Sequence, residues 1–243
     1  MATRAEFLER IRREVAKTPG LFGASPTPRP AQPGAAAETI RRELAERWPQ
    51  ALERFREEFE RVAGVFHRAP SLDAVPAIIA AIARERGARR VVSWDPAALG
   101  FDPAPALMRD GLTVAVARSG QEDEKSRERH REEAAQAELG VTGADFVLAE
   151  TGTLILLSGS GRPRSTSLLP DVHVAVFGRE RLLETLEQVG VVLEALHVDP
   201  DRAMSGAMIT FITGPSRTAD IELTLTRGVH GPKEVHAVFV EAP

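Results

Sequence analysis

The sequence contains no cysteine and no tyrosine. Without cysteine, this chain cannot form a disulfide, offer a thiol nucleophile, or hold zinc or an iron–sulfur cluster through thiolates. Without tyrosine, it lacks one common acid–base side chain. A redox role would therefore need an electron carrier on another chain or on a bound small molecule. The absence of cysteine also fits a reducing compartment.

Long apolar runs are absent as well. No stretch reaches the roughly 20 apolar residues that cross a bilayer. The N-terminus, Met-Ala-Thr-Arg-Ala-Glu-Phe, lacks the apolar segment of a signal peptide. We therefore expect a cytoplasmic protein with no membrane span. A net charge of −4, with ten Phe and two Trp in 243 residues, gives no basic-aromatic surface for nucleic acid.

What is present describes a globular protein with a separate N-terminal segment. Hydrophobic residues make up 43% of the chain and charged residues 27%, which suffices for one substantial core. An amphipathic helix is predicted over 4–17, followed by a linker containing Pro26, Pro28, Pro30 and Pro33. We predict two parts: residues 1–35 as helix and Pro-rich linker, and residues 36–243 as an α/β domain whose first part, 36–70, is a helical lead-in.

Hydrophobic periodicity predicts alternating helices and strands in the larger part. The expected helices are 36–65 with a break at Pro49, 72–86, 126–139 and 179–189. The expected strands are 90–94, 112–117, 144–149, 153–157, 172–177, 208–213 and 236–240. Gly152 indicates an antiparallel hairpin turn. This order predicts an α/β fold with a mixed, mainly parallel sheet flanked by helices, preceded by the N-terminal helical extension.

Three polar segments follow predicted strands, and the first is the turn Glu150-Thr151-Gly152-Thr153. Glu150 can act as a base, a nucleophile or a ligand anchor, beside two hydroxyls and a closely approachable glycine. A hairpin whose threonines satisfy the turn explains the same residues equally well.

The second polar segment is a Gly/Ser-rich loop over 158–170 that contains Arg162 and Arg164. Its backbone N–H groups and guanidinium groups can cradle an anion. It lacks the Gly-Lys-Ser/Thr of a phosphate-binding Walker loop. We prefer Arg164 as the ligand-binding arginine because it adjoins the hydroxyl run, although a surface loop is the favoured local interpretation.

The third polar segment covers 209–222 together with 228–232. Gly214 permits close backbone approach, and Arg217 carries a fork suited to a carboxylate or a phosphate. His230 is a candidate acid–base group, although a loop histidine bonded to a backbone carbonyl is at least as common. A capped strand-to-helix turn remains the structural alternative. The candidate ligand-binding residues of this segment are Thr213, Gly214, Pro215, Ser216, Arg217, Thr218, Asp220 and Glu222.

We expect the three polar segments to converge at one shared sheet edge. Glu150 and His230 would then be the catalytic candidates beside Thr151, Gly152, Thr153, Arg164 and the residues of the third segment. No two histidines stand at a zinc-binding spacing, so we expect no metal site.

Several of these segments, in their order along the chain, together resemble the LutC/YkgG family, whose members carry the LUD domain associated with lactate utilisation. The segments that carry the resemblance are 143–146, 149–154, 167–173, 213–222 and 228–232. The resemblance implies a fold like that of the NagB/RpiA/CoA-transferase superfamily. It also implies a role in oxidation of L-lactate to pyruvate beside iron–sulfur partners (LutA/LutB-like), with no cofactor held in this chain.

Three hypotheses about function follow. In the first, the chain is a cytoplasmic subunit of a lactate-oxidising system and binds a small anionic ligand through Arg217 and nearby polar turns. In the second, it is a stand-alone enzyme acting on a phosphosugar or an acyl-CoA through Glu150. In the third, it is an interaction module that docks through its N-terminal helix. The sequence leaves catalysis by the chain itself and homo-oligomer formation open.

Overall fold

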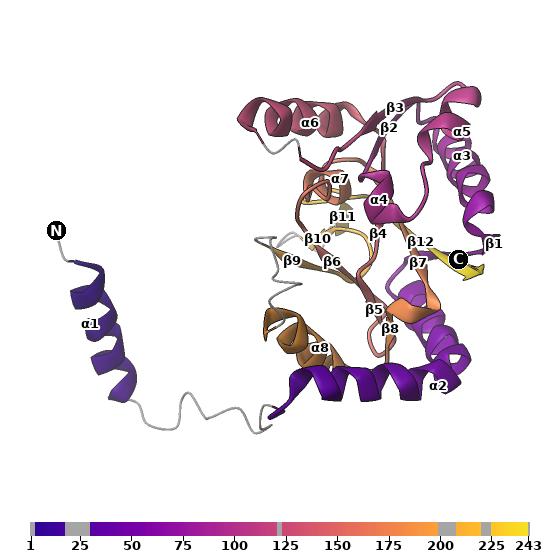
Figure 1. The fold of residues 1–243 in the computed structure, drawn as a ribbon. Coiled ribbons are helices and arrows are strands. Elements are labelled where there is room, and N and C mark those ends of the chain that lie inside the picture. Colours follow the sequence, from indigo (N-terminus) through magenta and orange to yellow (C-terminus); the bar gives the residue numbers. More distant parts are fainter. Residues whose placement is uncertain (1–2, 18–29, 121–122, 199–207, 220–224, 243) are drawn as a thin grey trace. The chain divides into compact units, whose positions relative to one another are not determined.

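The computed structural model describes residues 3–17, 30–120, 123–198, 208–219 and 225–242 (Figure 1). The chain divides into two units, Met1–Ala31 and Gln32–Pro243. The first unit contains helix α1 (Arg4–Ala16), as the apolar spacing predicts. None of the described helices is both long and apolar enough to cross a membrane.

Helix α1 is stabilised locally by a capping box. The Thr3 hydroxyl accepts a hydrogen bond from the backbone of Glu6, and the Glu6 carboxylate accepts one from the backbone of Thr3. Its apolar side chains at helical spacing are Phe7, Leu8, Ile11 and Val15, and all four are exposed within their unit.

Six strands of the second unit form a parallel sheet in the order β1-β12-β7-β4-β2-β3. Every pair of neighbours in this sheet runs parallel, so all six carboxyl ends meet at one edge. The strands are β1 (Val65–Ser71), β2 (Arg90–Ser93), β3 (Thr113–Val116), β4 (Leu139–Gly143), β7 (Val172–Gly178) and β12 (Glu234–Ala242).

A second, four-stranded sheet has the order β8-β5-β6-β9. Its strands are β5 (Phe146–Leu148), β6 (Thr153–Leu157), β8 (Leu182–Leu183) and β9 (Ile209–Ile212). β6 pairs antiparallel with both β5 and β9, which confirms the predicted hairpin at Gly152. A separate antiparallel pair joins β10 (Arg217–Ala219) to β11 (Leu225–Arg227).

Helices cover both faces of the parallel sheet (Figure 1). The helices of the second unit are α2 (Pro33–Arg61), α3 (Val75–Arg86), α4 (Pro96–Leu99), α5 (Ala104–Arg109), α6 (Glu124–Gln136), α7 (Ser165–Leu168) and α8 (Leu186–Val198), with short turns η1 (Leu72–Ala74) and η2 (Arg179–Arg181). α3 and α5 cover one face, where Ile79 and Leu107 pack with Val91. On the opposite face, Ala134 of α6 packs on Val92. The predicted α/β class is confirmed.

Helix α2 contributes the largest apolar stripe of the core. Leu52, Phe55 and Phe59 are fully buried at the spacing of one helix face. The ring of Phe55 stacks on Phe59 at 5.3 Å and meets Phe177 of β7 edge-on at 5.4 Å. α2 therefore packs against the second sheet and against the parallel sheet beneath it.

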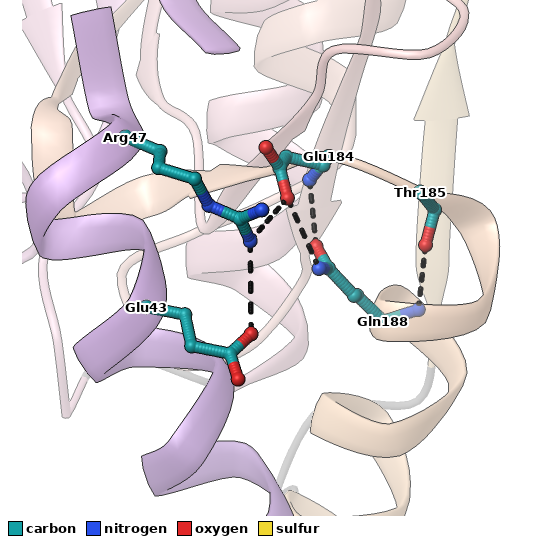
Figure 2. A network of polar contacts seen from close by, with 5 residues as sticks. All are labelled: Glu43, Arg47, Glu184, Thr185 and Gln188. Atoms are coloured by element: carbon teal, nitrogen blue, oxygen red, sulfur yellow. Dashed lines mark hydrogen bonds and ion pairs between the residues drawn. The ribbon is translucent and has the colours of Figure 1, made fainter. Parts of the chain in front are cut away.

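A polar network fixes α2 to the start of α8 (Figure 2). Arg47 of α2 lies 3.0 Å from the Glu184 carboxylate and 3.6 Å from Glu43. Gln188 accepts a hydrogen bond from the backbone of Glu184, and its own backbone donates to the Thr185 hydroxyl. The Arg47–Glu184 pair joins α2 to the residues before α8, and the Gln188 contacts order those residues locally.

The break expected at Pro49 is wrong, because α2 runs through this residue. A proline inside a helix removes one backbone hydrogen bond and costs about 3 kcal/mol. Leu44 and Leu52 are buried on either side of Pro49, and each buried leucine contributes roughly 2 kcal/mol. Tertiary packing therefore outweighs the local cost.

Further differences from the sequence prediction concern strands. β10 and β11 were not predicted, and β10 stands where the alternative of a strand-to-helix turn placed a helix. The helix expected over 179–189 begins only at Leu186, because Leu182 and Leu183 pair with β5 as β8. The helix expected over 36–65 ends at Arg61, and residues 65–71 form the unpredicted strand β1. β4 was not predicted either, since its sequence Leu-Gly-Val-Thr-Gly contains two glycines that weaken a strand pattern.

Two buried histidines stand in strands of the parallel sheet. His173 is fully buried, and its Nε2 lies 2.8 Å from the Thr142 hydroxyl. His236 lies with Nδ1 2.9 Å from Nε2 of His67. Burial lowers the pKa of His173 to about 3, and burial lowers the pKa of His236 to about 4 despite the nearby Glu234 carboxylate.

These shifted pKa values predict acid sensitivity. The folded-state pKa of both histidines lies below the unfolded value near 6.5, so between about pH 4 and 6.5 the unfolded chain binds more protons. The free energy of unfolding should therefore fall with decreasing pH, by up to about 1.4 kcal/mol per pH unit for each histidine. Urea unfolding at several pH values checks this. His173→Gln should make the free energy of unfolding less dependent on pH than in the wild-type protein. His197→Asn, at an exposed position of α8, is the control and should leave this dependence unchanged. The same dependence in the wild-type protein and both variants would contradict the assignment to His173.

Candidate functional site

The first and third polar segments meet at the ends of β6 and β9. Thr153 lies with its hydroxyl 2.6 Å from that of Thr151 and 2.8 Å from that of Thr213. The cause is the antiparallel pairing of β6 with β9, which places Ile212 opposite Leu154. Three hydroxyl groups from two turns therefore form one connected chain.

This hydroxyl cluster packs against the carboxyl end of α2. Gly152 has φ +60°, and an added Cβ would overlap the backbone nitrogen of Phe59. Gly214 has φ +74°, and an added Cβ would overlap the Val62 carbonyl oxygen. Both turns therefore need glycine for conformation and for space.

Arg217 and Glu150 are both bonded to the ends of helices. Arg217 donates through Nη2 to the carbonyl of Val62, at the carboxyl end of α2. The Glu150 carboxylate accepts a hydrogen bond of 2.8 Å from the backbone of Leu186, the first residue of α8. Each charge has the sign that a helix dipole favours at that end. Both side chains are exposed, so each has a structural contact without being buried.

Ser216 connects the third segment to the turn before β12. Its backbone donates to the Pro232 carbonyl at 2.9 Å, and its hydroxyl accepts from the backbone of His230 at 3.2 Å. His230 is exposed and lies near the amino ends of the parallel strands. Pro215 is buried and Thr218 lies in β10, whereas Asp220 and Glu222 lie outside the described residues.

The second polar segment does not join the hydroxyl cluster. It leaves β6 after Leu157, at the end opposite Thr153. Arg164 precedes α7, where its carbonyl accepts hydrogen bonds from Ser167. Its exposed guanidinium makes no hydrogen bond or ion pair with any residue that the structure describes. The expectation of one shared edge for all three segments is therefore wrong, because the two ends of β6 separate them.

Polar residues that were not among the predicted site residues lie instead at the carboxyl ends of β4, β2 and β3. Asp95 follows β2, and its carboxylate accepts hydrogen bonds from the backbone of Ala97 at 2.8 Å and of Ser119 at 2.7 Å. The bond from Ser119, which follows β3, is the main cause that lowers the pKa of Asp95. Asp145 follows β4 at the same edge.

The Gly/Ser-rich loop ties these strand ends together. The Gly161 carbonyl accepts a hydrogen bond of 2.9 Å from the backbone of Asp95, and the Ser160 hydroxyl accepts one of 3.2 Å from Gly120. Arg162 donates through Nη1 to the Asp145 carboxylate at 2.9 Å. Residues 158–162 thus lie across the carboxyl edge of the parallel sheet.

Asp145 is the carboxyl group of this edge whose pKa is raised. Its side chain is 13% exposed, and its second oxygen accepts a hydrogen bond of 2.7 Å from the backbone of Leu157. Burial raises the pKa of Asp145, although the Leu157 N–H and the charge of Arg162 oppose this shift. A buried carboxyl paired with an arginine at a strand end is a functional candidate. It was missed because β4, the strand before it, was not predicted.

A metal centre finds no support in the described part of the chain. No group of three or more His, Cys, Asp or Glu side chains there is arranged to hold an ion. The charged side chains described at this edge include the carboxylates of Asp95 and Asp145 and the guanidinium of Arg162.

Comparison with known proteins decides the family. Residues 52–240 match the model of the LUD domain. The chain belongs to the LUD domain family. Among its relatives, Lactate utilization protein C of Halalkalibacterium halodurans is 38% identical over 172 residues, 70% of each chain. The same-named protein of Shouchella clausii is 34% identical over 161 residues, 64% of each. These matches confirm the resemblance to the LutC/YkgG family.

A solved structure shares the fold of this LUD domain. The crystal structure of a DUF162 family protein from Deinococcus radiodurans superposes with a TM-score of 0.54 and 22% identity. The match covers 79% of this chain and 98% of that chain. At this identity, the comparison supports the architecture alone.

The contact between Gly152 and α2 yields a stability prediction. Gly152→Ala should destabilise the fold, because the new Cβ meets both a positive φ and the α2 backbone. Gly87→Ala is the matched control, with φ +65° and open space around the added atom. The control should cost about 1–2 kcal/mol, and Gly152→Ala about 2 kcal/mol more, from overpacking. Denaturant unfolding measures both; equal losses would show that the close approach contributes nothing.

Proposed function

We propose that the chain is a subunit of a lactate-utilisation system that supports oxidation of L-lactate to pyruvate. The observation that carries this proposal is the match, over 70% of the chain, to a relative named Lactate utilization protein C. The oxidation releases two electrons and two protons. Because the chain has no cysteine, thiolate-bound iron–sulfur clusters that accept these electrons would belong to partner proteins of the LutA/LutB kind.

The ligand in this proposal is a small carboxylate, and Arg217 is the residue that the sequence predicts to bind it. One of its nitrogens donates to the Val62 carbonyl. The exposed side chain keeps further donors for an anion, which supports the prediction. The neighbouring carboxyl end of α2 counts against it, since that end of a helix dipole repels anions.

The alternative of a stand-alone enzyme using Glu150 has less support. A nucleophilic or basic carboxylate must be free to reach its substrate. The Glu150 carboxylate instead bonds the first residue of α8, Leu186. This contact explains the acidic residue at that turn by its position at the amino end of α8.

Growth on L-lactate tests the proposed function. A strain lacking the gene should fail to grow on L-lactate as sole carbon source, and the wild-type gene should restore growth. Arg217→Ala tests the ligand residue that the sequence predicts: poor restoration would place the ligand at Arg217, and full restoration would place it elsewhere. Arg131→Ala, at a 67% exposed position of α6, is the matched control and should restore growth fully. Unimpaired growth of the deletion strain, with no second gene of this family present, would contradict the proposal.

A further inference from the structure

The parallel sheet changes its direction of growth between β4 and β2. The chain passes from β2 to β3 at one side, returns past β2 to β4, and then continues to β7 on the other side. The connection after β2 runs through α5 on one face of the sheet. The connection after β4 returns to β7 through α7, which packs on α6 at the opposite face, where His130 lies 3.1 Å from Thr166. The loops after β2 and β4 therefore diverge. In open α/β sheets, ligands bind at such a switch point, outside the carboxyl ends of the strands.

Arg162 stands at this switch point with one side of its guanidinium fixed. Nη1 is bonded to Asp145, which follows β4. Nε and Nη2 make no hydrogen bond to another described residue, and the side chain is 30% exposed. The Nε–Nη2 edge is the geometry that binds the two oxygens of a carboxylate in parallel. Asp145 holds this edge in place without occupying it.

The charges around this edge favour a monoanion. Besides Arg162, Arg181 acts electrostatically on Asp145, and Arg118 acts on Asp95. Arg181 is itself paired with Glu180 at 3.1 Å, so three arginines stand against three carboxylates here. A small monocarboxylate adds one negative charge near Asp95 and Asp145, whereas a phosphate dianion adds two and is repelled more strongly.

We infer that the carboxyl edge between β2 and β4 binds a small monocarboxylate through the Nε–Nη2 edge of Arg162, with Asp145 as its positioning residue. The ligand class, that of lactate and pyruvate, rests on the proposed function, whereas the site rests on the geometry. This assignment moves the ligand from the end of α2, where Arg217 lies, to the switch point of the sheet. Arg217 is then mainly a cap of α2.

Calorimetric titration of the full chain tests this site. L-lactate and pyruvate should bind, and neutral lactamide, which has almost the same shape as lactate, should not. Arg162→Ala and Arg162→Lys should each weaken binding at least about tenfold, since lysine lacks the bidentate edge. Arg217→Ala should leave the affinity within about twofold. Inorganic phosphate in place of lactate identifies the ligand class and should bind more weakly.

Two further variants separate positioning from folding. Asp145→Asn should weaken lactate binding in the protein that retains Arg162. In the Arg162→Ala variant it should cause no further loss of affinity, because Asp145 acts through that arginine. Gly159→Ala places a methyl group 3.4 Å from Nη2 of Arg162, an ordinary contact distance. This variant should keep the unfolding midpoint and still weaken binding, because the methyl group narrows access to the free edge.

The outcomes of the binding and growth experiments are independent. Undiminished binding by Arg162→Ala, loss of binding in Arg217→Ala, or tighter binding of phosphate than of lactate would each overturn the inference. Failure of every carboxylate to bind would overturn it too, while the growth result would still decide the proposed function. Conversely, Arg162-dependent binding in a protein dispensable for growth on L-lactate would leave the site standing and reject the role.

Discussion

Two glycine turns approach the carboxyl end of α2 closely, and this contact positions both sheets relative to the helix. Gly152 and Gly214 leave no space for a side chain there, so the β5–β6 hairpin and the end of β9 are held against the helix. From this junction β6 runs to Leu157, whose backbone bonds the Asp145 carboxylate. One five-residue strand thus connects the helix junction to the carboxyl edge of the parallel sheet.

In this arrangement some charged residues stabilise helix ends, whereas Arg162 is available to bind a ligand. At the helix junction, Glu150 and Arg217 bond the ends of α8 and α2, where helix dipoles favour their charges. At the sheet edge, Arg162 is bonded on one side and keeps the other side free. The second kind of arginine presents two donors to an anion in a fork that Asp145 already orients.

The sequence predicted the features that are set by residues close together along the chain. It missed the features that are set by which strands lie next to each other in the sheet. The Phe55 and Phe59 stripe and the Gly152 hairpin follow from local periodicity and turn chemistry, and both are present. The helix continuing through Pro49 depends on packing from distant strands, and so does the strand at β4. Asp145 became visible as a candidate only once β4 was placed in the sheet next to β2, because its partner Arg162 reaches it from the loop after β6.

The sharpest measurement is a crystal structure of the protein with L-lactate. It should show the ligand carboxylate paired with Nε and Nη2 of Arg162 at the carboxyl edge of β2 and β4, with Arg217 still bonded to Val62. A lactate molecule bound to Arg217 beside the hydroxyls of Thr153 and Thr213, with nothing at Arg162, would contradict it.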